Sequence, residues 1–144
     1  PFQFMGFVPK KTGHKKEMLV SCIHYEGTSI LYETPHRLLA TLTMLQELSP
    51  EQPVALAKEL TKLYEKLFTG SATQVLDQLK TRTVKGEWVL LIEGGKREET
   101  TMTVSEHVEH MQETFGVSQK EAIRLVAQAR NQPKRAIYNT YHNL

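Results

Sequence analysis

The sequence has a single cysteine, no long hydrophobic run and a small net charge. Cys22 is its single cysteine, so the chain can form no internal disulfide, which suits a reducing compartment. No apolar run approaches the ~18 residues that a membrane-spanning helix requires. The formal net charge is only +2, too small by itself to indicate a polyanionic partner. These features predict a cytoplasmic protein with no membrane association.

The composition is otherwise that of a globular protein. Hydrophobic residues make up 40% and charged residues 24% of the 144 residues, and a chain of this length can bury roughly two-thirds of its unfolded surface. The sequence begins at Pro1 directly in an apolar segment, without an initiator methionine or a signal-peptide pattern. We therefore expect it to continue a longer protein.

Strand-like and helix-like patterns alternate through the first two-thirds of the chain. Runs of β-branched, aromatic and apolar residues predict strands at 2–8, 28–33, 53–60 and 87–93. Helical spacing of apolar residues predicts helices at 17–25, 35–48 and 71–79, with a basic loop at 10–16, while 63–69 fits either state. This alternation is typical of an α/β fold, with a mixed sheet of about five strands covered by helices.

Only helical patterns follow the polar segment 94–99, whose Gly94-Gly95 pair predicts a hinge. Helices are expected at 105–115, after Ser118 and at 133–141, and the spacing of Ser118 and Glu121 predicts a capping box. We therefore expect an α/β domain over residues 1–95 and a small helical tail over residues 96–144.

No complete catalytic signature occurs in the sequence. It has no nucleophile elbow, phosphate loop, dinucleotide fingerprint or zinc-ligand spacing. His107 and His110 are the only helically spaced histidine pair, and without a third ligand this pattern favours a solvated helix face. The sequence predicts no metal site and leaves the catalytic residue unknown.

Polar residues at two strand ends are candidates for a site. Glu33 closes one strand and Arg37 lies in the first turn of the next helix, where α/β proteins often bind ligands; an ordinary cap with a Glu33–Arg37 ion pair explains the pattern equally well. The charged segment 58–66 is either a solvated strand end or a cleft rim, with Thr61 donating to a ligand and lysines holding phosphate. The residues alone leave both questions open.

Basic residues cluster in two places. They are Lys10, Lys11, Lys15 and Lys16 near the amino terminus, and Arg124, Arg130, Lys134 and Arg135 in the tail. Clustered cations are what phosphate binding requires, and Tyr138 and Tyr141 could stack on bases. A merely solubilising surface is the alternative.

Four segments in order carry a resemblance to a known family. They are FMGFVPKK at 4–11, LYETPHRL at 31–38, AKELTKLYE at 57–65 and KGEWVLLIEG at 85–94. Together they resemble the second half of the ribosomal RNA small-subunit methyltransferase I family, a branch of the tetrapyrrole methylase superfamily. The match is close over 2–94 and extends more weakly into the tail. Val8, Thr34 and Lys58 depart mildly from the family's usual Leu, Ser and Arg.

The resemblance implies an enzyme that transfers a methyl group from S-adenosylmethionine to the 2′-hydroxyl of a cytidine in small-subunit ribosomal RNA. The cofactor would lie between two halves, bound mainly by a first half that this sequence lacks, so the chain alone should be inactive. Glu33 and Thr61 would face the cofactor cleft, and a homodimer is implied. For RNA contacts we expect Lys10, Lys11, Lys15, Lys16, Arg37, Lys62, Lys134 and Arg135.

Proton removal from the ribose hydroxyl needs an acceptor. Glu33, Glu59 and Glu65 are candidates, but no motif identifies one of them. Two other functions remain open. One is a tetrapyrrole methylase acting on a macrocycle, and the other is a non-catalytic RNA-binding or dimerisation module.

Overall fold

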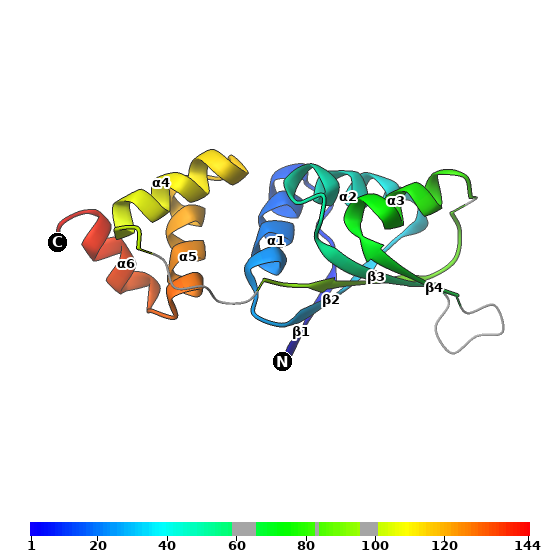
Figure 1. The fold of residues 1–144 in the computed structure, drawn as a ribbon, viewed down its shortest axis with the longest axis horizontal. Coiled ribbons are helices and arrows are strands. Elements are labelled where there is room, and N and C mark those ends of the chain that lie inside the picture. The colour runs from blue at the N-terminus through cyan, green and yellow to red at the C-terminus, as the bar shows by residue number, and fades with distance from the viewer. Residues whose placement is uncertain (59–65, 83, 96–100) are drawn as a thin grey trace.

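A computed structural model describes residues 1–58, 66–82, 84–95 and 101–144 of the chain. Its larger part has two layers, a sheet and a layer of helices on one face of that sheet (Figure 1). The described strands are β1 (Phe2–Phe7), β2 (Thr28–Glu33), β3 (Pro53–Lys58), β4 (Lys66–Ser71) and β5 (Trp88–Glu93). The described helices are α1 (Thr12–His24), α2 (Pro35–Leu48), α3 (Ala72–Lys80), α4 (Val104–Phe115), α5 (Gln119–Arg130) and α6 (Lys134–Tyr141).

The described strands form one mixed sheet in the order β1-β2-β5-β3-β4. β1 pairs with β2 in parallel, and the other neighbours pair antiparallel. This confirms the predicted α/β class and the mixed sheet of about five strands. The ambiguous segment 63–69 contributes to β4, because residues 66–71 pair along the whole length of β3.

One face of the sheet carries the core. In β2 the side chains of Ser29, Leu31 and Glu33 are buried beneath the helices. In β5 every second side chain, from Trp88 to Ile92, is buried as well. The leucine stripe of α2 packs here, as its spacing predicted, with Leu38, Leu42 and Leu45 fully buried. The apolar residues that repeat with helical spacing and those that alternate along the strands thus pack into a single hydrophobic core.

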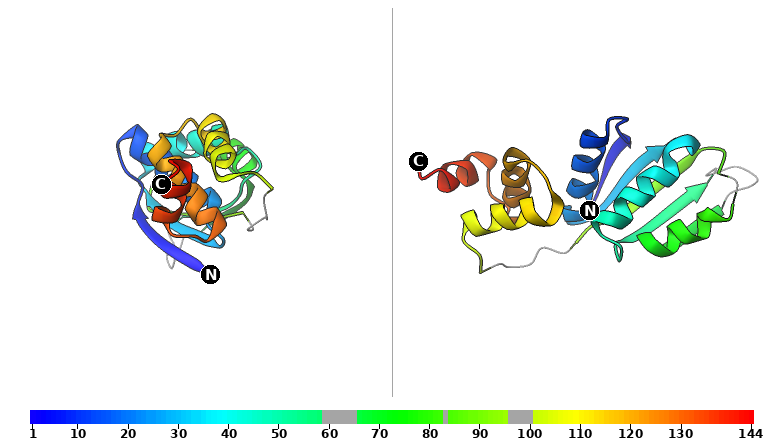
Figure 2. Two further views of the ribbon diagram at one scale, coloured as in Figure 1. Left: turned by 90° about the vertical axis from the view of Figure 1, so that its left-hand side faces the viewer. Right: turned by 90° about the horizontal axis from the view of Figure 1, so that it is seen from above.

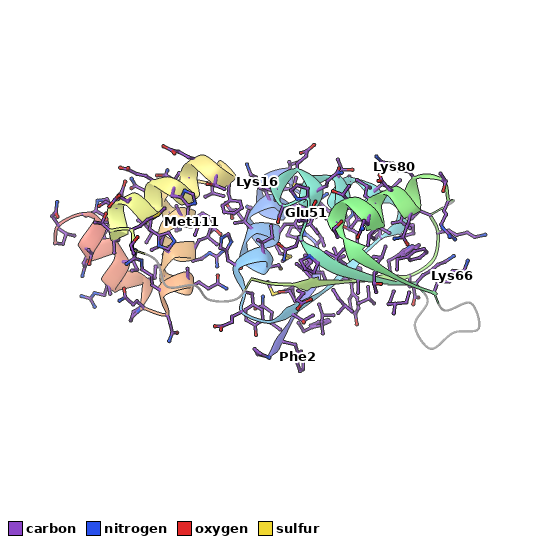
Figure 3. All side chains as sticks on the ribbon, in the orientation of Figure 1. Phe2, Lys16, Glu51, Lys66, Lys80 and Met111 are labelled. Atoms are coloured by element: carbon purple, nitrogen blue, oxygen red, sulfur yellow. The ribbon has the colours of Figure 1, made fainter. Side chains whose placement is uncertain are left out.

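The other face of the sheet is covered by no helix among the described residues (Figure 1). Its side chains include exposed aromatic and apolar groups, and Phe2 projects from this side in Figure 3. The exposed large apolar residues of these strands are Phe2, Phe4, Phe7, Tyr32 and Leu67. The sheet therefore presents an unusually apolar surface.

α1 begins earlier than its apolar pattern predicted. The structure starts this helix at Thr12, so the predicted basic loop at 10–16 is wrong from residue 12 onward. Lys15 and Lys16 lie on the first turns of a helix, and Lys15 is buried. Helical geometry tolerates polar residues on a first turn, so the apolar pattern marks only the later part of the helix.

The segment after β5 is held tightly where it begins. The Gly94 amide donates to the Gly27 carbonyl at 2.8 Å, and the Gly95 amide donates to the Ile23 carbonyl at 2.9 Å. A Cβ atom on Gly94 would lie 1.7 Å from the Tyr25 carbonyl oxygen. The first two residues of the predicted hinge are therefore fixed against the end of α1 and the residues that follow it, and residues 96–100 lie outside the described part of the chain.

α4, α5 and α6 form a second hydrophobic cluster beside α1 (Figure 2). Val20 of α1 belongs to this cluster, and Arg124 of α5 reaches Ser21 of α1 at 3.4 Å. The Ser118 hydroxyl caps α5 as predicted, but Glu121 does not complete a capping box because its carboxylate pairs with Arg124. In the described part of the chain, no helix is both long and apolar enough to cross a membrane.

Candidate functional site at the carboxyl edge of the sheet

One edge of the sheet gathers the ends of several strands. Strands β1, β2 and β3 run in one direction, and strands β4 and β5 run in the opposite direction. The carboxyl ends of β1, β2 and β3 therefore meet the amino ends of β4 and β5 at one edge, which we call the carboxyl edge. Glu33 and Lys58 both lie opposite Trp88 there, and Lys58 also lies opposite Lys66.

Glu33 is an anchor at this edge. It is 3% exposed. One carboxylate oxygen accepts from the Thr34 amide at 2.8 Å, and the other accepts from the Thr41 hydroxyl at 2.6 Å. The Arg37 Nε lies 3.3 Å from the first of these oxygens. Because these donors engage both oxygens, the carboxylate fixes the start of α2 and is poorly placed to take a proton from a substrate.

Arg37 also contacts Glu33 and Thr34, but these contacts do not use all of its hydrogen-bond donors. Its Nε donates to the Thr34 hydroxyl at 3.2 Å, besides its ion pair with Glu33. Its Nη1 is buried and has no hydrogen-bond partner among the described residues. A guanidinium nitrogen without an acceptor is costly when it is shielded from water, and Arg37 is not among the residues that line the neighbouring pocket.

A pocket of about 460 Å³ opens beside this cluster. Its size falls within the roughly 300–1,000 Å³ range of small-molecule sites. Its walls are mainly apolar and aromatic and include Glu33 and Trp88. The lining residues are Phe7, Tyr32, Glu33, Thr34, Pro35, Gly86, Glu87, Trp88 and Val89.

A smaller hollow of about 250 Å³ lies on the other side of Trp88. It is lined by Lys58, Lys66, Phe68, Leu79, Arg82 and Trp88. The indole nitrogen of Trp88 donates to the Lys85 carbonyl at 3.1 Å, which helps to fix the orientation of the ring. Trp88 is thus the shared wall of an apolar pocket and a basic one.

The predicted site residues are distributed unevenly around this edge. Glu33 lies at the edge and lines the larger pocket, with Arg37 bound to its carboxylate. Lys10 and Lys11 are both exposed just after the end of β1. Thr61 and Lys62, together with the candidate bases Glu59 and Glu65, lie outside the described residues. The ion pair expected between Glu33 and Arg37 is present.

The other predicted RNA contacts lie away from this edge. Lys15 is buried in α1, and Lys16 donates to the Gly116 carbonyl at 3.4 Å. Lys134 and Arg135 are exposed on α6, which Figure 1 places at the opposite end of the molecule from α3 and β4. A single ligand would have to be extended to contact both groups.

Sequence reasoning missed that Trp88 and Arg82 line these hollows, whereas Lys66 belongs to the segment 58–66 whose lysines were considered for phosphate binding. A tryptophan in an apolar strand usually belongs to the core, so the pattern around Trp88 indicates no role in a site. Arg82 lies in no motif. A hairpin pairing of the segments before and after residues 59–65 would have placed Lys66 opposite Lys58, and that pairing was the one signal available.

His107 is a correction to the expected solvated helix face. It is buried, and Arg130 Nε donates to its Nδ1 at 3.0 Å. Burial lowers the pKa of His107, and the nearby positive charge of Arg130 lowers it further. His110 is exposed, as expected. The described residues contain no group of three side chains suited to hold a metal ion.

Comparison with known proteins places this chain beside a set of bacterial enzymes. No protein-family model matches it. It is 37% identical over 150 residues to Ribosomal RNA small subunit methyltransferase I of Bacillus subtilis (strain 168), a match covering 99% of the chain and 51% of that relative. The proteins of the same name from Halalkalibacterium halodurans and Synechocystis sp. are 36% and 35% identical, over 98% and 95% of the chain and 51% and 50% of each relative. The chain therefore spans about half the length of the curated relatives it matches.

Proposed function

We propose that this chain is the carboxy-terminal part of an enzyme of the ribosomal RNA small subunit methyltransferase I family, because relatives of that name match 95–99% of its length. In this proposal the carboxyl edge forms one wall of the methyl-transfer cleft. The domain division at residue 95 and a homodimer of the whole enzyme are parts of the same proposal. The observation that carries it is the 460 Å³ pocket lined in part by the buried Glu33, in a chain matched over nearly its whole length by methyltransferases.

The larger pocket is suited to part of S-adenosylmethionine. Its apolar and aromatic walls would contact rings and methylene groups of the cofactor. The cofactor would supply an electrophilic methyl group. In the proposal most of its binding surface comes from the half of the enzyme not represented in this sequence.

Residues of this chain would act mainly by positioning. Glu33 holds Thr34 and Arg37 beside the pocket, and mostly apolar walls would exclude water from the transfer. Methyl transfer to a ribose hydroxyl requires an in-line approach and a proton acceptor late in the reaction. Glu33 is an unsuitable acceptor because its oxygens are already engaged, so the acceptor would be Glu59, Glu65 or a group outside this chain.

We propose small-subunit ribosomal RNA as the substrate, with the 2′-hydroxyl of a cytidine as the methylated group. The test is methyl transfer from labelled S-adenosylmethionine to small-subunit RNA by the full-length protein that contains this sequence. Nuclease digestion and mass spectrometry then locate the methyl group. The expected product is a 2′-O-methylcytidine, with no turnover by the 144-residue chain alone. Methylation of a porphyrinoid but not of RNA would instead establish a tetrapyrrole methylase.

A further inference from the structure

Three cations surround the smaller hollow, and they come from three places in the chain. Lys58 ends β3, Lys66 begins β4 and Arg82 follows α3. No carboxylate lies among the described residues that line this hollow. In the described part of the chain, none of the three forms an ion pair. The hollow thus concentrates positive charge that the described neighbouring side chains do not neutralise.

The arrangement is unfavourable for the protein without a ligand. Lys58 and Lys66 are directly opposite each other in the antiparallel register of β3 and β4, and like charges in such a pair destabilise a sheet. Lys58 Nζ lies 5.9 Å from the centre of the Trp88 ring, and the Arg82 guanidinium lies 5.2 Å from the centre of the Phe68 ring. Aromatic faces attract these cations, but a bound anion would offset their mutual repulsion directly.

The size of the hollow indicates what kind of anion fits. At about 250 Å³ it is smaller than the roughly 300–1,000 Å³ of pockets that enclose a whole small molecule. It therefore suits one anionic group of a larger ligand. Trp88 lines both this hollow and the larger pocket, so the two hollows share one residue of the carboxyl edge.

We propose that Lys58, Lys66 and Arg82 bind a backbone phosphate of single-stranded RNA next to the nucleotide that is methylated. This inference rests on the proposed function, because it names the part of the substrate that the carboxyl edge holds. In this proposal the basic hollow and the apolar pocket bind two adjacent parts of one RNA strand. Lys66 lies at the start of β4 in Figure 3, with its side chain accessible to such a strand.

The test measures binding of a fluorescein-labelled single-stranded RNA dodecamer to the 144-residue chain by anisotropy at several salt concentrations. The variants are Lys58→Gln, Lys66→Gln and Arg82→Gln. Lys80→Gln is the matched control, since Lys80 is an exposed cation on α3 that pairs with Asp77. Trp88 is the sole tryptophan, so a change in its emission on binding reports on the hollow and the larger pocket that it also lines. Inorganic phosphate and a dodecamer of the same sequence with an uncharged backbone serve as competitors.

We expect each substitution in the hollow to weaken binding about threefold to fivefold, the upper range for exposed charge pairs. The slope of log affinity against log salt should fall by about 0.7 for each phosphate-binding cation that is removed. Lys80→Gln should change neither quantity, and the uncharged oligonucleotide should not alter Trp88 emission. Lys66→Gln should also raise the stability of the free chain, because it removes a like-charge pair. If Lys66 had only a structural role, replacing it would not weaken RNA binding and at the same time raise the stability of the chain.

Three results would overturn the inference. They are unchanged affinity and salt slope in all three variants, displacement of the RNA by inorganic phosphate at equal phosphate concentration, and absence of RNA binding at low salt. If RNA binds and only Lys134 and Arg135 variants weaken it, the inference fails while the proposed enzyme function stands. Failure of the full-length protein to methylate RNA is a separate result that contradicts the proposed function itself.

Discussion

The Thr41 hydroxyl donates a 2.6 Å hydrogen bond to the Glu33 carboxylate, which ties the second turn of α2 to the last residue of β2. Both side chains are buried, and Thr41 is fully so. A buried carboxylate is tolerated only when its oxygens have donors. The bond therefore helps to set where α2 begins relative to the carboxyl edge and so where Arg37 lies.

Replacing Thr41 with Val should destabilise the chain by about 1–3 kcal/mol, because one Glu33 oxygen loses its buried donor. Thr43→Val is the matched control. Thr43 lies on the same helix, and its hydroxyl donates to the Leu39 carbonyl on the exposed side. Urea unfolding followed by circular dichroism measures both variants. Equal stability losses would show that the Glu33 cluster does not stabilise the fold.

Gly94→Ala should be among the most damaging single substitutions in the chain. The new Cβ would lie 1.7 Å from the Tyr25 carbonyl oxygen, whereas at Gly95 the nearest atom would be 3.6 Å away. We expect a loss at or beyond the upper end of the ~1–3 kcal/mol range of overpacking for Gly94→Ala, and a small effect for Gly95→Ala. Thermal unfolding of the two variants makes the comparison. A Gly94→Ala variant as stable as Gly95→Ala would refute the tight packing after β5.

The cluster of α4, α5 and α6 should lose stability in acid. Burial lowers the pKa values of both His107 and His24 in the folded chain below the ordinary value of 6.5. The unfolded chain then binds more protons than the folded chain between those lowered values and 6.5. Stability is therefore complete above about pH 7 and falls as the pH drops through 6.5. Thermal melts at pH 7.5 and pH 5 should show a lower melting temperature at pH 5.

His107→Gln separates the contribution of this histidine. The groups that act on His107 are Arg130 on α5, His110 on its own helix and His24 on α1. Glutamine keeps an acceptor for Arg130 but does not titrate, so the difference between the two melting temperatures should shrink. His110→Gln, on the exposed side of α4, should leave that difference unchanged. An undiminished difference in His107→Gln would assign the acid sensitivity to other groups.

The sequence predicted the layers of the fold better than the details of the site. The leucines of α2 and the strand at 28–33 repeat with the periods of a helix and a strand, so burial on one face was predictable. A Glu33–Arg37 ion pair was one of two interpretations of the sequence, and the structure contains that pair. Lys58 and Lys66 were not predicted as a pair, since their proximity depends on a strand register that local patterns do not specify. The burial of His107 was missed for a similar reason, because a helix pattern does not show which neighbour will cover it.

The most direct test of the central claim is S-adenosylmethionine binding by the full-length protein, measured by isothermal titration calorimetry, with substitutions on one strand of the carboxyl edge. Val89 lines the 460 Å³ pocket, and Leu91 lies two residues along β5 on the same face but outside that pocket. We predict that Val89→Phe, which narrows the pocket, weakens cofactor binding about tenfold or more, equivalent to about 1.4 kcal/mol. Leu91→Phe should bind like the unmodified protein. Unchanged binding in Val89→Phe, or equal losses in both variants, would contradict the assignment of this pocket to the methyl-transfer cleft.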